Sequence, residues 1–571
     1  MAIQIGNLKV KKKYIAAFFL GISASVGILR FIIYLIPRSK PDNQLIWGLS
    51  AARVFLGSIF LGLLLINIGG FLLTFVNFGK WQEKFEENIY SLFSNHHIKI
   101  MAVLYFILAL TGTFFLFTIP PIIRPLRFLA SYYVRLGGFL SWVLIADLLL
   151  IVMLRIIAAE TFHKNKKMVR LDTIFTCVGL FVGTFVLYLQ TAILIGWINK
   201  TTYSFFDLLA EQFVQGKLYL ENPPYTHDLT LYKGKWYAPM PPLPAILLMP
   251  FAYFVGAEGI STSYLSMLVS ASNGVLLFLI LKEMNLRKWI KLSQSGIIAL
   301  VILFLFGTPH LWLGISGRGW YFSQILTAFF LALAIYAALR SWSAWWVGAF
   351  VAVAMTARPT ALMTWPFVLA IAMQILKENQ EEVELRRVFQ WSAKTIVPIA
   401  LAVTGLLTYN YLRFENFLDF GYVTVNAGPE IVHNVQTWGT FSAHFIPINL
   451  SVMFFKLPFW NPGGQWPILP SATGMSIFLT TPALIYLFRR YSKDWWVIGA
   501  WSAVFFSAAL LSLYHNTGAH QFGYRYILDF LVPLIALLAV GLGKKIPWHF
   551  LLLVFASIAI NLYGAHWFMN G

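Results

Sequence analysis

The feature that most constrains this chain is a succession of apolar stretches, most of them about as long as one membrane crossing. A helix needs about 20 apolar residues to cross the hydrocarbon of a bilayer. Only 11% of the 571 residues are charged and 59% are hydrophobic, whereas soluble domains carry about 25% charged residues. Because lipid cannot hydrogen-bond the backbone, such segments must form helices. The sequence therefore predicts an all-α polytopic membrane protein.

The apolar stretches predict about 15 transmembrane helices. A basic connector, residues 155–172, follows the first four and marks a domain boundary. We therefore expect an accessory four-helix membrane module at 1–170 and a second membrane domain at 171–571. The first four spans are expected near 14–36, 46–77, 98–119 and 127–153, and the others near 172–198, 262–282, 292–307, 320–338, 341–357, 360–376, 393–412, 473–488, 495–513, 525–543 and 547–568.

The apolar segment 241–256, PPLPAILLMPFAYFVG, decides the topology. If it crossed the membrane, the basic connectors that follow it would all face outward, against the positive-inside bias. We therefore expect a short interfacial or re-entrant helix at the membrane surface, in a protein of the plasma (inner) membrane whose N-terminus is cytoplasmic. The long polar loops then lie on the external or periplasmic face: 199–260, 308–319, 413–472 and 514–524.

The formal charge of +20 does not indicate a nucleic-acid partner. The basic residues lie mostly between the spans, where they set topology and contact anionic headgroups. The single cysteine, Cys177, excludes an internal disulfide and a cysteine zinc site. His433 and His444 are eleven residues apart in irregular sequence, so no metal site is predicted.

Five segments in a fixed order carry a resemblance to a known family. They are FFDLLAEQFVQGKLYL at 205–220, HDLTLYKGKWYAPMPPLPAILLMPF at 227–251, TARPTAL at 356–362, YNYLRFENFLDFGY at 409–422 and QFGYRYILDFLVPL at 521–534. With their sidedness they resemble the GT-C superfamily of membrane glycosyltransferases, in particular bacterial proteins similar to protein O-mannosyltransferases and to the aminoarabinose transferase of lipid A. The resemblance covers about 172–571. It implies a GT-C-like core whose first external loop holds a juxtamembrane helix.

The resemblance implies an inverting transfer of a sugar from a polyprenyl-phosphate donor to a glycan, lipid or protein acceptor outside the membrane. In that family a carboxylate of the first loop acts as general base or orients the acceptor. The usual Asp-Glu pair of the family is replaced here by Thr202 and Tyr203. The resemblance leaves open a divalent cation, Mg²⁺ or Mn²⁺, and implies no other cofactor.

Displacement of a lipid phosphate needs a base near the acceptor hydroxyl. Asp207 and Asp228 are both candidates, and the sequence does not choose between them. Glu211 follows Asp207 by one helical turn, and His227 precedes Asp228 directly. We expect these two residues to assist. A solvated loop or a capped turn is the alternative interpretation of the same acids.

Cations must hold the departing phosphate, and the planar fork of arginine suits that role. Arg358 and Arg525 each lie at the external end of a span, where a charge is costly and generally has a partner. Arg318, between two glycines, is a third candidate. Tyr237 and Tyr524 are predicted to contact substrate. Snorkelling of the arginines to headgroups is the alternative.

Other functions remain open. A transporter or flippase of a lipid-linked saccharide would show internal repeats and polar, interrupted spans, whereas here the acids gather in the external loops. A glycan ligase or polymerase would share the donor and the sidedness. A membrane scaffold would not need several polar loops of mixed charge.

Overall fold

The computed structural model describes residues 166–195, 197, 204–379, 384–461, 463–518, 520–543 and 546–570, together with strands β1 (Ala2–Ile5) and β2 (Leu8–Lys11), which pair antiparallel. The four spans expected between 14 and 153 lie outside the described residues. The chain divides into two units, Met1–Gly183 and Thr184–Gly571. The cavity described below belongs to the second unit.

The described part is mostly helical, and seven of its helices are long and apolar enough to cross a membrane. They are α6 (Lys166–Leu194), α9 (Thr262–Leu286), α12 (Gly319–Leu339), the continuous pair η5 (Pro359–Thr364) and α14 (Trp365–Glu378), α15 (Leu385–Phe414), α19 (Trp495–Ser512) and α21 (Trp548–Asn570). The pair α10 (Gln294–Phe306) and α11 (His310–Ser316), bent by 53°, makes an eighth if it is one span. The expectation of an all-α membrane protein is confirmed at this level, and the total of about 15 spans stays a prediction.

Three other predicted spans form shorter or broken elements. The stretch 341–357 contains α13 (Ala344–Met355). The stretch 473–488 contains α18 (Ile477–Thr480) and the 3₁₀ helix η7 (Pro482–Leu487), and 525–543 contains the 3₁₀ helix η8 (Arg525–Phe530) and α20 (Leu531–Val540). In each stretch the apolar run continues while the regular α-helix does not.

Close backbone approach holds the long helices together. A Cβ on Gly348 of α13 would lie 2.4 Å from the Thr395 carbonyl oxygen of α15, and one on Gly499 of α19 would lie 2.3 Å from Ala370 Cβ of α14. Such pairs of helices can approach only where one carries a glycine, as in other membrane helix interfaces. Helix α12 packs against both α9 and α13 and so occupies the centre of this unit.

The first long polar loop forms its own small elements. Helix α7 (Phe205–Val214) packs on α8 (Leu243–Val255), and β3 (Thr230–Tyr232) pairs antiparallel with β4 (Lys235–Tyr237). With 13 residues, α8 is about 20 Å long, too short to cross about 30 Å of hydrocarbon. Its length agrees with the expected short helix at the membrane surface.

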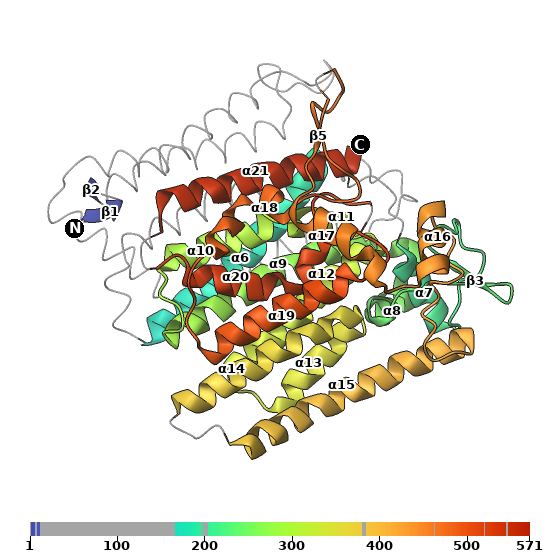
Figure 1. Cartoon of the computed structure of the whole chain (residues 1–571), viewed down its shortest axis with the longest axis horizontal. Helices are drawn as coiled ribbons and strands as arrows, with labels where there is room; N and C mark the ends of the chain where they lie inside the picture. Colours follow the sequence, from blue (N-terminus) through green and yellow to red (C-terminus); the bar gives the residue numbers. More distant parts are fainter. Residues whose placement is uncertain are drawn as a thin grey trace, which may run out of the picture. The chain divides into compact units, whose positions relative to one another are not determined.

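The second unit has two chemically different ends. Helices α7, α8 and α16 (Pro429–Trp438) and strand β3 gather at one end, the cavity end (Figure 1). At the other end, Arg287 contacts Glu283 at 3.3 Å and Glu378 at 3.4 Å, and Arg340 contacts Glu283 at 3.1 Å. These ion pairs tie together the ends of α9, α12 and α14. The remaining elements are η4 (Ala257–Gly259), η6 (Ala443–Phe445), α17 (Ile446–Phe454) and the hairpin β5 (Phe459–Trp460) and β6 (Ile468–Leu469).

Candidate functional site

A cavity of about 1060 Å³ opens at the cavity end. Its walls come from segments far apart in sequence: 225–228 and 239–241 of the first loop, the start of α12, residues 357–360, the loop 416–427 and residues 510–526. Such a volume is at the upper end of the range for small-molecule sites. The cavity therefore has room for a ligand as large as a sugar with its phosphate.

Asp228 lines the cavity from a tight turn. Its φ of +63° is left-handed, a conformation that Asp and Asn tolerate better than most residues. Its N–H donates to the Asn426 carbonyl at 2.8 Å, and the Asn426 N–H donates to the Leu229 carbonyl at 2.7 Å. The Thr230 hydroxyl donates to the Gly421 carbonyl. These bonds fix the Asp228 turn to the second long loop, and His227 Nε2 lies 3.8 Å from Asp228 Oδ1.

Arg358 lies where α13 stops, because Pro359 restricts the preceding residue to extended backbone. Its Nε donates to both oxygens of Asp529, at 3.1 and 3.3 Å, and its Nη2 donates to Asp529 Oδ2 at 3.0 Å. The Thr360 hydroxyl donates to the same oxygen at 2.8 Å. A bidentate pair of this kind fixes the plane of the guanidinium. Arg358 therefore lines the cavity in one defined orientation.

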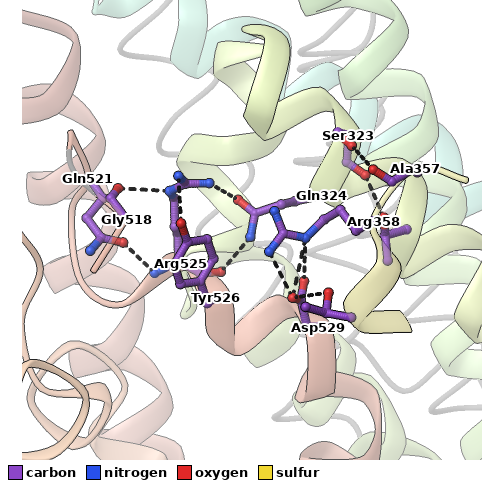
Figure 2. Close-up of polar contacts among 11 residues, drawn as sticks. Ser323, Gln324, Ala357, Arg358, Gly518, Gln521, Arg525, Tyr526 and Asp529 are labelled. Carbon is purple, nitrogen blue, oxygen red and sulfur yellow. Dashed lines mark hydrogen bonds and ion pairs between the residues drawn. The ribbon is translucent and has the colours of Figure 1, made fainter. Parts of the chain in front are cut away.

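Arg525 lines the same cavity with different partners. Its Nε donates to the Gly518 carbonyl at 2.9 Å and its Nη1 donates to Gln324 Oε1 at 2.8 Å (Figure 2). Its Nη2 lies 3.3 Å from the Tyr526 hydroxyl. The residue is only 4% exposed, and within the described part of the chain it makes no ion pair. It is thus a buried cation whose partners are all neutral.

The Tyr321 hydroxyl marks the point where the opposite charges converge. It donates to the His520 carbonyl at 2.7 Å and lies within electrostatic range of Arg525, Arg318 and Asp228. The guanidinium carbon of Arg318 lies 4.4 Å from the centre of the Trp197 ring. One carboxylate and two cations of the cavity lining therefore act electrostatically on the same tyrosine.

Two histidines line the cavity in the neutral state. Burial lowers the pKa of His515 to about 4, against a smaller opposing effect of its contact with the Thr440 carbonyl. Burial, and then the charge of Arg318, lower the pKa of His520. Neutral imidazoles and the neighbouring Tyr422, Tyr514 and Tyr526 give the wall both hydrogen-bonding atoms and flat apolar faces. Sugars bind surfaces of this mixed character.

Five of the predicted site residues line the cavity and four do not. The five are His227, Asp228, Arg318, Arg358 and Arg525. Asp207 and Glu211 lie on α7 and Tyr237 and Tyr524 lie elsewhere, all outside the lining. Tyr237 packs edge-on to Phe414 with ring centres 5.3 Å apart, and Tyr524 is fully buried.

Asp207 lies outside the cavity lining, but the pKa of its carboxyl is raised. It is partly buried on α7, and burial raises the pKa of its carboxyl from 3.8 to about 7, although a hydrogen bond from the Leu208 N–H opposes this effect. The charge of Glu211 raises the pKa slightly further. The structure thus separates the two candidate acids: Asp228 lines the cavity, whereas Asp207, half-buried on α7, does not.

Several polar residues of the site, His515 among them, were not among the predictions. Asp529, Asp419 and His520 all belong to it, the last two as lining residues. Asp529 is a lone acid in the apolar run ILDFLVPL, and such a residue usually has a partner in the membrane. That signal predicts an ion pair but does not name Arg358, which lies 171 residues away. Among the described residues no three His, Cys, Asp or Glu side chains come together as metal ligands.

Comparisons with known proteins give no relative. No protein-family model, no curated protein and no solved structure matches this chain. The function must therefore be inferred from the residues of the cavity and from the order of the sequence segments that surround it.

Proposed function

We propose that this protein is an integral membrane glycosyltransferase of the GT-C type. It moves a sugar from a polyprenyl-phosphate donor to an acceptor on the external face, with inversion at the sugar carbon. Asp228 is the general base, and Arg525, with Arg318 and Arg358, holds the donor phosphate. The observation that carries the proposal is a cavity lined by a buried arginine that no acid of the described residues pairs with, in electrostatic range of the same tyrosine as the Asp228 carboxylate.

The state of Arg525 supports an anionic ligand. A buried charge is costly unless it is paired, and Arg525 has only neutral partners among the described residues. It lines a cavity of about 1060 Å³, so a ligand phosphate can supply the missing negative charge. Aromatic residues around it suit the sugar that the phosphate carries.

The reaction follows from these positions. The Asp228 carboxylate accepts the proton of the acceptor hydroxyl, and the oxygen attacks the anomeric carbon as the bond to the phosphate oxygen breaks. That oxygen leaves with the bonding electrons as polyprenyl phosphate, whose charge the arginines stabilise. Attack on the face opposite the leaving group gives inversion. The donor arrives through the lipid, because nucleotide sugars are absent outside the cytoplasm.

Sugar transfer in vitro tests the proposal. Detergent-purified protein is given a panel of polyprenyl-phosphate sugars and a membrane extract as acceptor, with and without EDTA, and release of polyprenyl phosphate is followed. We expect release with one donor. Asp228→Asn keeps the left-handed turn and should lower kcat about 10²–10⁴-fold. Glu221→Gln, an exposed acid of the same loop paired with Lys217, is the matched control and should keep wild-type activity.

The alternatives give different results in the same experiment. Binding of the donors without any release would favour a transporter or flippase, for which the bent pair α10 and α11 is a supporting feature. Transfer of a preassembled glycan instead of a single sugar would favour a ligase or polymerase. Loss of release in EDTA would identify a divalent cation, Mg²⁺ or Mn²⁺.

A further inference from the structure

Asp529 is the most enclosed acid of the site. Its side chain is 0% exposed, whereas that of Arg358 is 13% exposed and reaches the cavity. Its two oxygens accept four hydrogen-bond contacts, three from Arg358 and one from Thr360. Asp529 does not line the cavity. It therefore acts on a ligand through Arg358 and Thr360, the two cavity-lining residues that donate to it.

The positive charges of the two arginines in Figure 2 are compensated to different degrees. The charge of Arg358 is compensated by Asp529, and that of Arg525 is not compensated by an acid of the described residues. One helix holds both in place: Gln324 of α12 accepts from Arg525, and the neighbouring Ser323 donates to the Ala357 carbonyl at 2.7 Å, directly before Arg358. The two guanidiniums are thus fixed relative to each other but attract an anion unequally.

We propose that Asp529 is a positioning residue that gives the two arginines different roles toward the ligand. It cancels the charge of Arg358 and fixes its plane, so that Arg358 orients the ligand phosphate while Arg525 attracts it. This inference rests on the proposed function for the identity of the ligand. It predicts that removal of Asp529 makes ligand binding stronger and turnover slower.

The main test compares Asp529→Asn with the wild type in two measurements. The first is the affinity for a short-chain prenyl monophosphate in detergent, measured by calorimetry from 50 to 500 mM salt. The variant adds one uncompensated positive charge, so its affinity at low salt should rise about five- to tenfold and fall more steeply with salt. The second is kcat for sugar transfer, which should fall about tenfold or more because Arg358 loses its fixed plane. A merely structural role would lower affinity and kcat together.

Two further variants keep the test decisive if Asp529→Asn folds poorly. Arg358→Gln with Asp529→Asn removes both charges, so the affinity and its salt dependence should return to wild type while kcat stays low. Thr360→Val removes one hydrogen bond to Asp529 and changes no charge. It should lower kcat about two- to fivefold without change in the salt dependence.

The outcomes separate this inference from the proposed function. Weaker binding by Asp529→Asn, or full kcat in the double variant, would overturn the positioning role while leaving the transferase standing. A wild type that binds prenyl phosphate but never transfers sugar would end the transferase proposal, and the affinity and salt measurements would still decide the role of Asp529. A wild type that binds no prenyl phosphate would overturn both.

Discussion

Arg525 and Arg413 show at the residue scale why burial alone does not define a ligand site. Arg413 is also buried, at 3% exposed, and its Nη1 and Nη2 donate to the Ala238 carbonyl at 2.7 Å and to Asn410 Oδ1 at 2.9 Å. Both arginines have neutral partners, but only Arg525 lines the cavity. Arg413 instead fastens the end of α15 to the first long polar loop. The two residues form a matched pair for experiment.

Arg525→Gln should weaken binding of prenyl monophosphate about 10–100-fold and flatten its salt dependence, because the buried charge facing the phosphate is lost. Arg413→Gln should lower the thermal midpoint of unfolding while leaving the affinity within about twofold, since its partners belong to the protein. Calorimetric titration and thermal unfolding in detergent measure the two effects. Equal loss of affinity in both variants would mean that Arg525 is only a structural residue.

Asp207→Asn should stabilise the protein at alkaline pH. At about pH 4 and below, the carboxyl is protonated in both folded and unfolded chains, so the substitution changes little. As the pH rises from about 4 to 7, the unfolded chain ionises first and the wild type loses stability. Above pH 7 the full cost applies, because the folded carboxyl, with its pKa of about 7, is ionised against burial. We expect a gain on the order of 1–2 kcal/mol at pH 8.5, allowing for solvent screening.

Thermal unfolding of the Asp207→Asn variant at pH 4.5 and pH 8.5 checks this difference, with the exposed Glu221→Gln as a control that should gain no stability at either pH. A stabilisation that is larger at pH 4.5 than at pH 8.5 would reverse the sign of the argument.

One sequence signal that pointed to cavity residues is a charge at the end of an apolar run. Arg358 and Arg525 could be chosen on that basis, and both line the cavity. Tyr237 and Tyr524 could not be distinguished from other tyrosines, because whether an aromatic ring faces a cavity or another ring depends on tertiary packing. The partnership of Arg358 with Asp529 joins two distant segments. No local pattern contains it.

At the scale of the elements, the apolar length of a segment predicted where helices lie but not where they break. The stretch 473–488 is apolar enough, yet Pro482 forces Thr481 away from helical backbone, with φ −134°. A side chain of another helix satisfies a carbonyl at this break, because Asn561 Nδ2 of α21 donates to the Thr480 carbonyl at 2.7 Å. The Thr481 hydroxyl in turn donates to the Gly307 carbonyl, at the end of α10, at 2.9 Å. Only the packed structure shows that these partners are present.

The turn between α11 and α12 leaves no room for a side chain at Gly317. Gly317, which precedes Arg318, has φ +60°, and a Cβ there would lie 2.3 Å from Ser263 Cα and 2.5 Å from Ser263 N. Gly317→Ala should therefore displace the turn and cost about 3 kcal/mol or more, and prenyl phosphate affinity should fall as Arg318 moves. Thermal unfolding and titration check this. Gly428→Ala has open space around its Cβ and should leave both quantities unchanged.

A wild-type thermal midpoint in Gly317→Ala would show that the α11–α12 turn can relax without cost. Loss of stability in Gly428→Ala as well would show instead that glycine replacements in this protein destabilise it for a reason unrelated to close packing.

At the scale of the whole molecule, the two ends of the second unit allow the proposed sidedness to be measured. The lone Cys177 is replaced by Ser, and a single cysteine is introduced as Glu430→Cys on α16 or as Lys291→Cys before α10, both exposed positions. A membrane-impermeant maleimide should label the first in intact cells and the second only after permeabilisation. Labelling in the reverse order would place the cavity in the cytoplasm, where a lipid-borne donor would not be needed.

Helix α8 links the cavity to the physical state of the bilayer. Its apolar side chains Phe251, Tyr253 and Phe254 are 49–80% exposed, as expected of a helix that rests in the lipid surface. Met240 and Pro241, which line the cavity, directly precede it. In the proposed topology the depth of α8 would follow the position of the lipid surface, whereas Gln324, which accepts from Arg525, belongs to α12, a candidate membrane span. We therefore expect membrane thickness to set the height of the cavity and turnover in nanodiscs to pass through a maximum as lipid chain length is varied.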